Sequence, residues 1–132
     1  MIVDTSALLA ILKGEPDAKI FAEALATAPS SSISAGTLLE ASVVVDANRD
    51  PVLSRRLDDL VRAVPLLVEP VTADHVQIAR QGYRDFGRSS QHPAQLNFGN
   101  CFAYALARSR GEPLLFKGND FGHTDIEPQI QR

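Results

Sequence analysis

The chain has 132 residues, a formal net charge of −3 and 45% hydrophobic residues, values that fit one globular domain with a real core and argue against disorder. No apolar run approaches the roughly 20 residues of a membrane span, and the start, MIVDTSALLAIL, has neither a basic leader nor a small-residue cleavage site. The small net charge excludes attraction of nucleic acid by overall charge, so a polyanion would need a local basic patch or a bound cation. The single cysteine, Cys101, cannot form an internal disulfide and suits a reducing cytoplasm.

The first half of the chain predicts short apolar strands that alternate with amphipathic helices. Periodicity and cap residues predict, in order, a strand at 1–4, helices at 5–14 and 15–28, a strand at 30–34, and helices at 35–50 and 51–64. In the helix at 35–50, the spacing of apolar and small residues predicts a broad buried stripe made of Leu38, Leu39, Ser42, Val43 and Ala47.

The second half continues this alternation. We expect a strand at 65–71, a helix at 72–87 capped by Thr72, a polar loop at 88–95, a helix at 97–111 and, within 113–126, a strand, a turn at Gly118–Asn119 and a last short strand. Strands separated by helices predict an α/β fold, in which helices flank both faces of a short, mostly parallel central sheet. Residues 1–132 are expected to form a single domain, whose functional groups gather beyond the carboxyl ends of the strands.

Three acidic residues stand where this edge of the sheet is expected. Asp4 follows the strand residues MIV, Asp120 follows the strand and turn PLLFKGN, and Glu40 lies in a helix among apolar neighbours. Each has an ordinary alternative: Asp4 as a helix N-cap, Asp120 as a turn residue and Glu40 as an exposed helix former. Against the ordinary reading of Asp4, a carboxylate so close to a buried strand is costly without a partner or a cation.

Gathered in one crevice, the three acids would favour a bound cation. Like charges that lie close together raise one another's pKa unless a cation neutralises them. Oxygen ligands suit Mg²⁺ or Mn²⁺, whereas three scattered histidines and one cysteine argue against zinc. A divalent cation held by carboxylates indicates phosphodiester chemistry, because it polarises the phosphoryl group and activates a water.

Four segments of the chain resemble one known family. MIVDTSALLAIL, LLEAS, LNFGNCFAYALA and PLLFKGNDF stand in the order and spacing of the PIN-domain family and, more closely, of the VapC toxins of bacterial type II toxin–antitoxin modules. The resemblance covers nearly the whole chain. A single motif such as DTSAL is weak evidence, but the four together are specific.

The resemblance implies a fold and an activity. It implies a PIN-like α/β/α sandwich and a Mg²⁺- or Mn²⁺-dependent endoribonuclease that cuts structured RNA, tRNA or ribosomal RNA, in the bacterial cytoplasm. It also implies a homodimer, no membrane association, and inhibition by a VapB-type antitoxin whose C-terminal segment lies across the toxin's groove. Lys117 and Arg88 are candidates for contacts with RNA phosphates, and an ordinary solvated role is equally open to them.

The resemblance also implies site residues, and one of them departs from the family. The catalytic acids fall on Asp4, Glu40 and Asp120, with Thr5, Ser6 and Asn119 in support. The remaining acid falls on Asn100, because family members read NFGDC where this chain reads NFGNC. Asp4 and Asn100 are the implied metal positions. Asn is nearly isosteric with Asp and ligates weakly through its carbonyl oxygen, but it removes one negative charge, so we expect weaker metal binding and slower turnover.

Two questions stay open at this point. Asn100 is either an engineered substitution that silences a toxic nuclease or the mark of a natural degenerate copy; the other intact motifs favour engineering. The natural chain is either a ribonuclease toxin or a non-catalytic module that binds antitoxin or RNA. A phosphoryl-transfer domain with Asp4 as phospho-acceptor is disfavoured, because Thr5 and Ser6, not a second acid, stand beside Asp4.

Overall fold

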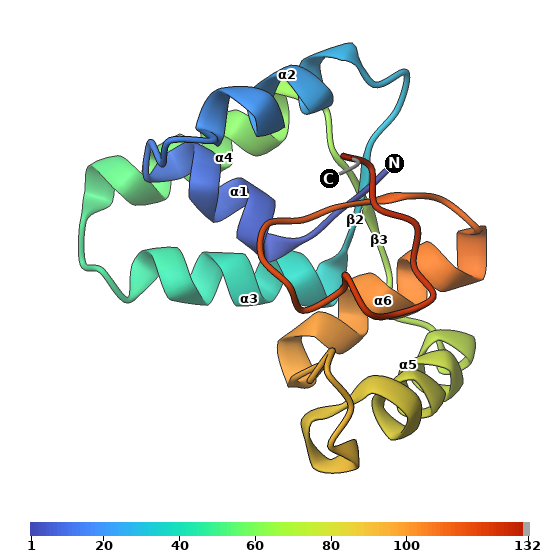
Figure 1. The fold of residues 1–132 in the computed structure, drawn as a ribbon. Coiled ribbons are helices and arrows are strands. Elements are labelled where there is room, and N and C mark those ends of the chain that lie inside the picture. Colours follow the sequence, from blue (N-terminus) through green and yellow to red (C-terminus); the bar gives the residue numbers. More distant parts are fainter. Residues whose placement is uncertain (131–132) are drawn as a thin grey trace.

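The computed structural model describes residues 1–130 and shows an α/β fold (Figure 1). The four strands are β1 (Ile2–Val3), β2 (Ser32–Ser34), β3 (Leu67–Glu69) and β4 (Leu114–Leu115). The helices are α1 (Thr5–Leu12), α2 (Ala18–Thr27), α3 (Ala35–Asp46), α4 (Pro51–Ala63), α5 (Ala73–Phe86), the 3₁₀ helix η1 (Arg88–Ser90) and α6 (Phe98–Arg110). The predicted α/β class and helix order are confirmed.

All strand pairs are parallel, in the order β3-β2-β1-β4. β1 is therefore central, with β2 on one side and β4 on the other, where Ile2 pairs with Leu114 and Val3 with Leu115. Since the strands are parallel, the residues that follow β1 and β4 emerge at the same edge of the sheet. The backbone N–H of Asp4 donates to the carbonyl of Leu115 at 3.0 Å, which fixes that edge.

The sheet separates two hydrophobic cores, because successive strand residues point to opposite faces. Val3 packs into the core that α1, α2, α3 and α4 cover. Its neighbour Ile2 packs into the second core, to which α6 contributes Ala103, Tyr104, Leu106 and Ala107. Figure 1 shows this division, with α1, α2 and α4 grouped away from α5 and α6. The two layers of helices make the predicted sandwich.

Side-chain caps begin the helices that follow the strands. Asp4 accepts the N–H of Ser6 at the start of α1, and Ser34, the last residue of β2, accepts the N–H of Gly36 at the start of α3. Thr72 caps α5 as predicted, by accepting the N–H of His75. Each such cap stabilises its helix by about 1 kcal/mol, and the first two place α1 and α3 at the carboxyl edge of the sheet.

Two structural predictions were wrong. The stripe predicted for α3 fails at Leu39, Val43 and Ala47, which are exposed, whereas Thr37, Ala41 and Val45 are buried. The neighbouring helices explain this choice: Ala41 and Val45 pack into the core that α1, α2 and α4 share. The last short strand expected within 113–126 is also absent from the described chain. Turns occupy that stretch, and an isolated bridge joins Leu114 to Pro128 instead.

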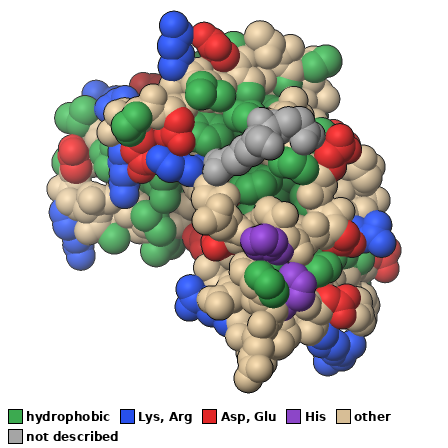
Figure 2. Space-filling view, viewed as in Figure 1, with side chains coloured by type: hydrophobic (Ala, Val, Ile, Leu, Met, Phe, Trp, Pro, Cys, Tyr) green, Lys and Arg blue, Asp and Glu red, His purple; other side chains and the backbone are tan. Residues whose placement is uncertain are grey.

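None of the described helices is long and apolar enough to cross a membrane. Acidic and basic side chains are interspersed on the face that Figure 2 shows, as the net charge of −3 suggests.

Candidate active site

Asp4 is the first residue after β1, and its side chain is 3% exposed. Its Oδ2 accepts two hydrogen bonds from Ser6, from the backbone N–H at 3.1 Å and from the hydroxyl at 2.7 Å. Its Oδ1 is buried and has no hydrogen-bond partner in the described chain. The ordinary and the functional interpretations of Asp4 therefore hold together: it caps α1, and it keeps one buried oxygen for something else.

The surroundings of Asp4 make its ionised form costly. Burial raises the pKa of the Asp4 carboxyl to about 6, the hydrogen bonds from Ser6 oppose that rise, and the nearby charge of Glu40 adds to it. A buried carboxylate with a raised pKa and an unpaired oxygen is the kind of group that gathers at functional sites. A cation or a hydrogen-bond donor at Oδ1 would relieve the cost.

Glu40 reaches the same place from α3. Its Oε1 accepts the hydroxyl of Thr5, the residue after Asp4, at 2.8 Å. Its Oε2 lies against the first turn of α6: a Cβ added at Gly99 would stand 1.6 Å from that oxygen. Only glycine leaves room for the carboxylate there. The side chain of Glu40 thus leans inward, and it connects the start of α1 with the start of α6.

Asn100 occupies the third position of α6 and is 8% exposed. Its Oδ1 accepts the backbone N–H of Asn97 at 3.0 Å, and its own backbone N–H donates to Oδ1 of Asn97 at 3.0 Å. This reciprocal pair is a capping box, which satisfies two free N–H groups at a helix start. Within the described residues the Nδ2 of Asn100 makes no hydrogen bond.

The segment after β4 is tied to the same edge by Ser6. The backbone N–H of Lys117 donates to the hydroxyl of Ser6 at 2.9 Å, and that hydroxyl donates to Asp4. Three residues further on, Asp120 is exposed, as is Asn119 beside it. Neither side chain makes a hydrogen bond or an ion pair within residues 1–130. The ammonium of Lys117 is bound by Glu15 and by Asp17, the latter at 3.0 Å, and these hydrogen bonds raise its pKa.

The structure therefore brings together some of the predicted site residues and not others. Asp4, Glu40 and Asn100 meet through Thr5, Ser6 and the first turn of α6, whereas Asp120 and Asn119 stand apart on an exposed turn. Among the described residues no cluster of three or more His, Cys, Asp or Glu side chains is arranged to hold a metal ion. Asn at position 100 leaves Asp4 and Glu40 as the two acids that the fold brings together.

Sequence reasoning missed two residues of this site, Asn97 and Gly99. The spacing of Asn97 and Asn100 is that of a capping box and was readable as one. The role of Gly99 depends on Glu40, which lies 59 residues earlier in the chain. The sequence around Gly99 therefore does not predict this role. Cys101 donates its thiol to the carbonyl of Asn97, and burial raises its pKa, as a structural thiol requires.

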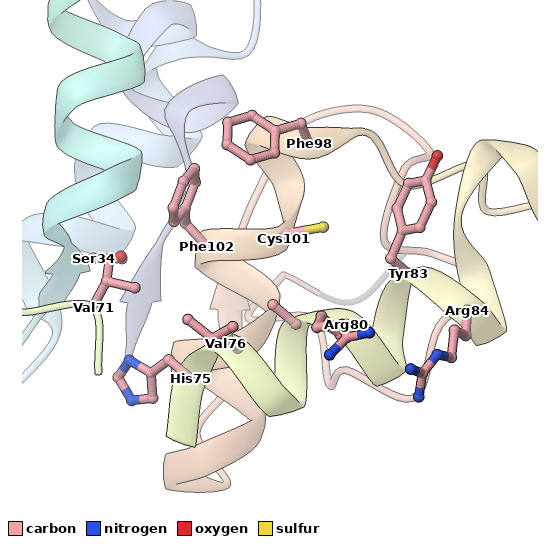
Figure 3. Close-up of a pocket in the computed structure, with 12 residues that line it drawn as sticks. Ser34, Val71, His75, Val76, Arg80, Tyr83, Arg84, Phe98, Cys101 and Phe102 are labelled. Carbon is pink, nitrogen blue, oxygen red and sulfur yellow. The ribbon is translucent and has the colours of Figure 1, made fainter. Parts of the chain in front are cut away.

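Beside the site lies an apolar hollow of about 590 Å³ between α5 and α6. Figure 3 shows Phe98, Cys101 and Phe102 on the α6 side, facing Val76 and Tyr83 of α5, with Arg80 and Arg84 along the margin. Phe98 is 78% exposed and stacks edge-on against Phe102. Phe98 also precedes Gly99 and Asn100 in the chain, so the hollow and the acidic site share one turn of α6.

Comparison with known proteins identifies the family. The PIN domain matches residues 1–127. The chain belongs to the PIN-domain family. It is similar to ribonuclease VapC28 of Mycobacterium tuberculosis, with 54% identity over 132 residues that cover 100% of this chain and 99% of that protein. Within the family it thus groups with the VapC ribonucleases, as its sequence motifs predicted.

Two solved structures show the same fold at low sequence identity. One is VapC20 of Mycobacterium tuberculosis, described as a sarcin–ricin loop cleaving toxin, with a TM-score of 0.70 and 19% identity, covering 96% of this chain and 98% of that one. The other is VapBC2 of Rickettsia felis bound to a DNA fragment from its promoter, with a TM-score of 0.75 and 13% identity, covering 97% and 96%. The PIN domain thus supplies the scaffold, and the geometry around Asp4 supplies the site.

Proposed function

We infer that this chain is the toxin of a type II toxin–antitoxin module and an endoribonuclease of the VapC kind. One observation carries this: a buried aspartate with an unpaired oxygen stands beside a second carboxylate at the carboxyl edge of a PIN-domain sheet. The 54% identity with VapC28 along the full chain supports the same function. The substrate that we propose is structured RNA, either tRNA or ribosomal RNA.

The oxygen atoms of Asp4 and Glu40 are of the type that binds a divalent cation. The Oδ1 of Asp4 is a buried, hard oxygen with no hydrogen-bond donor among the described residues, and the Glu40 carboxylate nearby adds negative charge. Hard oxygen ligands favour Mg²⁺ or Mn²⁺. Bound there, such a cation would polarise the scissile phosphate and lower the pKa of a water. Asp4 and Asn100 stand at the metal positions that the family resemblance implies, and those assignments remain predictions.

The chain's own residues would prepare this site before substrate arrives. The hydroxyl of Thr5 holds Glu40, and the hydroxyl of Ser6 holds both the Asp4 carboxylate and the backbone of Lys117. The turn that follows Lys117 carries Asn119 and Asp120. We propose that this turn closes over bound RNA and so brings the Asp120 carboxylate toward Asp4 and Glu40. Such positioning of charged groups is the main contribution of a protein to phosphodiester cleavage.

A homodimer and a VapB-type antitoxin are the proposed partners in the bacterial cytoplasm. The α3–α6 apolar face, which we define as Leu39 and Val43 of α3 with Phe98 and Phe102 of α6, is the surface that we assign to the second copy. Leu39 and Val43 are 65% and 59% exposed, and Phe102 packs against Gly36 on the same side of α3. Contiguous apolar surface of this kind marks protein–protein contacts.

Paired cleavage assays test the proposed activity. This chain and its Asn100→Asp form would be incubated with total tRNA and with ribosomal RNA, in Mg²⁺, in Mn²⁺ and in chelator. We expect metal-dependent cleavage by the Asn100→Asp form and at least tenfold slower cleavage by the parent. The Asp4→Asn variant of the Asn100→Asp form is the inactive control. No metal-dependent cleavage of either RNA by the folded Asn100→Asp form would contradict the proposal.

A second candidate function is favoured by Asn100 alone. The Oδ1 of Asn100 completes a helix cap, so the chain keeps its fold and its surfaces while it lacks one acid of the family's site. This is what a non-catalytic module that binds antitoxin or RNA requires. Tight antitoxin binding by both forms, together with no cleavage by either, would favour this second function.

A further inference from the structure

The side chain of Asn100 takes part in the N-terminal cap of α6. The Oδ1 of Asn100 accepts the backbone N–H of Asn97, and the backbone N–H of Asn100 donates to the side chain of Asn97. Turning the amide around would aim its NH₂ group at the N–H of Asn97, so two donors would face each other. The N–H of Asn97 would then lose its hydrogen bond in the capping box. The capping box therefore fixes which end of the amide is free.

The free end is the nitrogen. Nδ2 is a donor with no lone pair to offer a cation, and it makes no hydrogen bond within residues 1–130. The residue is 8% exposed, and Nδ2 is the end of its side chain that the cap leaves free. A carboxylate at the same position has two equivalent oxygens, one for the cap and one for the site.

One carboxylate oxygen of Asp4 and one of Glu40 are acceptors that lack a donor among the described residues. Among the described residues, the buried Oδ1 of Asp4 has no hydrogen-bond partner. The Oε2 of Glu40 lies against Gly99, the residue before Asn100, and accepts no hydrogen bond from residues 1–130. A neutral donor that reached these two carboxylates would lower their need for a cation. It also suits a phosphate oxygen, which accepts hydrogen bonds from amide N–H groups.

We propose that Asn100 contributes an N–H donor, not an oxygen ligand, to the acidic site, so that this chain binds a divalent cation weakly. The inference rests on the proposed function, in that the acidic site is a cation site when position 100 is a carboxylate. Replacing Asp by Asn at this position should therefore weaken cation binding by more than the loss of one charge alone. The only oxygen of the amide already accepts the N–H of Asn97 in the cap.

Mn²⁺ titration calorimetry on the full chain, at neutral pH and without RNA, tests this. We expect the Asn100→Asp form to bind Mn²⁺ at least tenfold more tightly than the parent. Gln77→Glu is the matched control, since it also replaces a neutral amide by a carboxylate, but at an exposed position of α5. It should change the affinity no more than about twofold, a range set by surface charge alone.

Each outcome decides between the alternatives. Equal, tight binding by the parent and the Asn100→Asp form would show that the amide oxygen is a ligand and would overturn the inference, while the proposed function would stand. An equal gain from Gln77→Glu would overturn it by showing that only overall charge matters. No binding by either folded form would overturn it together with the cation site of the proposed function.

A second variant keeps the test valid where Asn100→Asp fails to fold. Glu is the preferred third residue of a capping box, so Asn100→Glu retains the cap and adds a second oxygen. We expect it to bind Mn²⁺ more tightly than the parent as well. Far-UV circular dichroism in chelator shows which variants are folded before each titration. A folded Asn100→Glu form with the parent's weak affinity would contradict the proposal.

Discussion

At the scale of the residue, Asp4 combines two roles that conflict energetically. As an N-cap it stabilises α1 through the N–H of Ser6, but as a buried acid it carries an oxygen without a partner. Its pKa of about 6, against an ordinary value of 3.8, measures the cost of ionising it in the fold. A site that is strained in this way without its ligand exchanges stability for function.

The first prediction concerns the pH dependence of stability. Because the pKa of Asp4 is raised on folding, the stability that its protonated form provides is present below pH 3.8 and is lost as the pH rises through about 6. Since one pKa unit corresponds to about 1.4 kcal/mol, the loss amounts to at most about 3 kcal/mol at neutral pH. Asp4→Asn keeps the cap without the charge, so we expect it to be more stable than the parent at pH 7.5 and about equal at pH 4.

Urea unfolding at the two pH values would measure this difference. Asp50→Asn is the matched control, because Asp50 is also an N-cap but is exposed at the start of α4. It should leave the pH dependence of the parent unchanged. A stability of Asp4→Asn that falls with pH as steeply as that of the parent would show that Asp4 does not carry this cost.

At the scale of the element, the first turn of α6 concentrates most of the site. Asn97 caps the helix, Phe98 faces outward to the apolar hollow, Gly99 makes room for Glu40, and Asn100 completes the cap. Four consecutive residues therefore meet four different requirements. Such a turn tolerates few substitutions, although little of it belongs to the hydrophobic core.

The second prediction concerns Gly99→Ala. The added methyl would overlap the Glu40 carboxylate, 1.6 Å from Oε2, but that group is the flexible end of its side chain and moves at little cost. Alanine also has a better helix propensity than glycine, by about 1 kcal/mol. We expect a melting temperature near that of the parent and, in the Asn100→Asp background, at least tenfold weaker Mn²⁺ binding and slower RNA cleavage.

A double-mutant cycle separates displacement of Glu40 from other effects of the methyl group. Glu40→Asp shortens the side chain and reopens the space, so Gly99→Ala should cost much less activity in a Glu40→Asp chain than in a Glu40 chain. Additive losses would mean that Gly99 acts in some other way.

The same turn shows what sequence could and could not predict. The order of strands and helices followed from apolar periodicity, and Asp4 and Glu40 stood out because acids rarely interrupt apolar segments. The buried side of α3 did not follow, since the burial of Thr37 and Ala41 and the exposure of Leu39 depend on where the other helices pack against α3. The position of Asp120 relative to the other acids was likewise beyond reach, because the turn that carries it has no periodicity to interpret.

At the scale of the whole molecule, some exposed apolar side chains are isolated and others lie in a shared apolar face. On α4, Val52 is an isolated apolar residue that is 67% exposed, and single residues of this kind are ordinary on a soluble surface. Leu39 is equally exposed, at 65%, but it lies on the α3–α6 apolar face with two aromatic rings nearby. The two positions therefore form a matched pair for testing whether this face binds a second copy of the chain.

The third prediction is that Leu39→Glu abolishes dimerisation while Val52→Glu leaves it intact. Both substitutions place a carboxylate on an exposed helical position, so neither should lower the melting temperature by more than a degree or two. Only at Leu39 would the charge be buried, without a counter-ion, against a second copy, at a cost of several kcal/mol. Light scattering coupled to gel filtration should give twice the chain mass of 14.3 kDa for the parent and for Val52→Glu, and the single mass for Leu39→Glu. A parent that runs at the single mass at micromolar concentration would refute the homodimer, and dissociation by both variants would place the interface elsewhere than the α3–α6 apolar face.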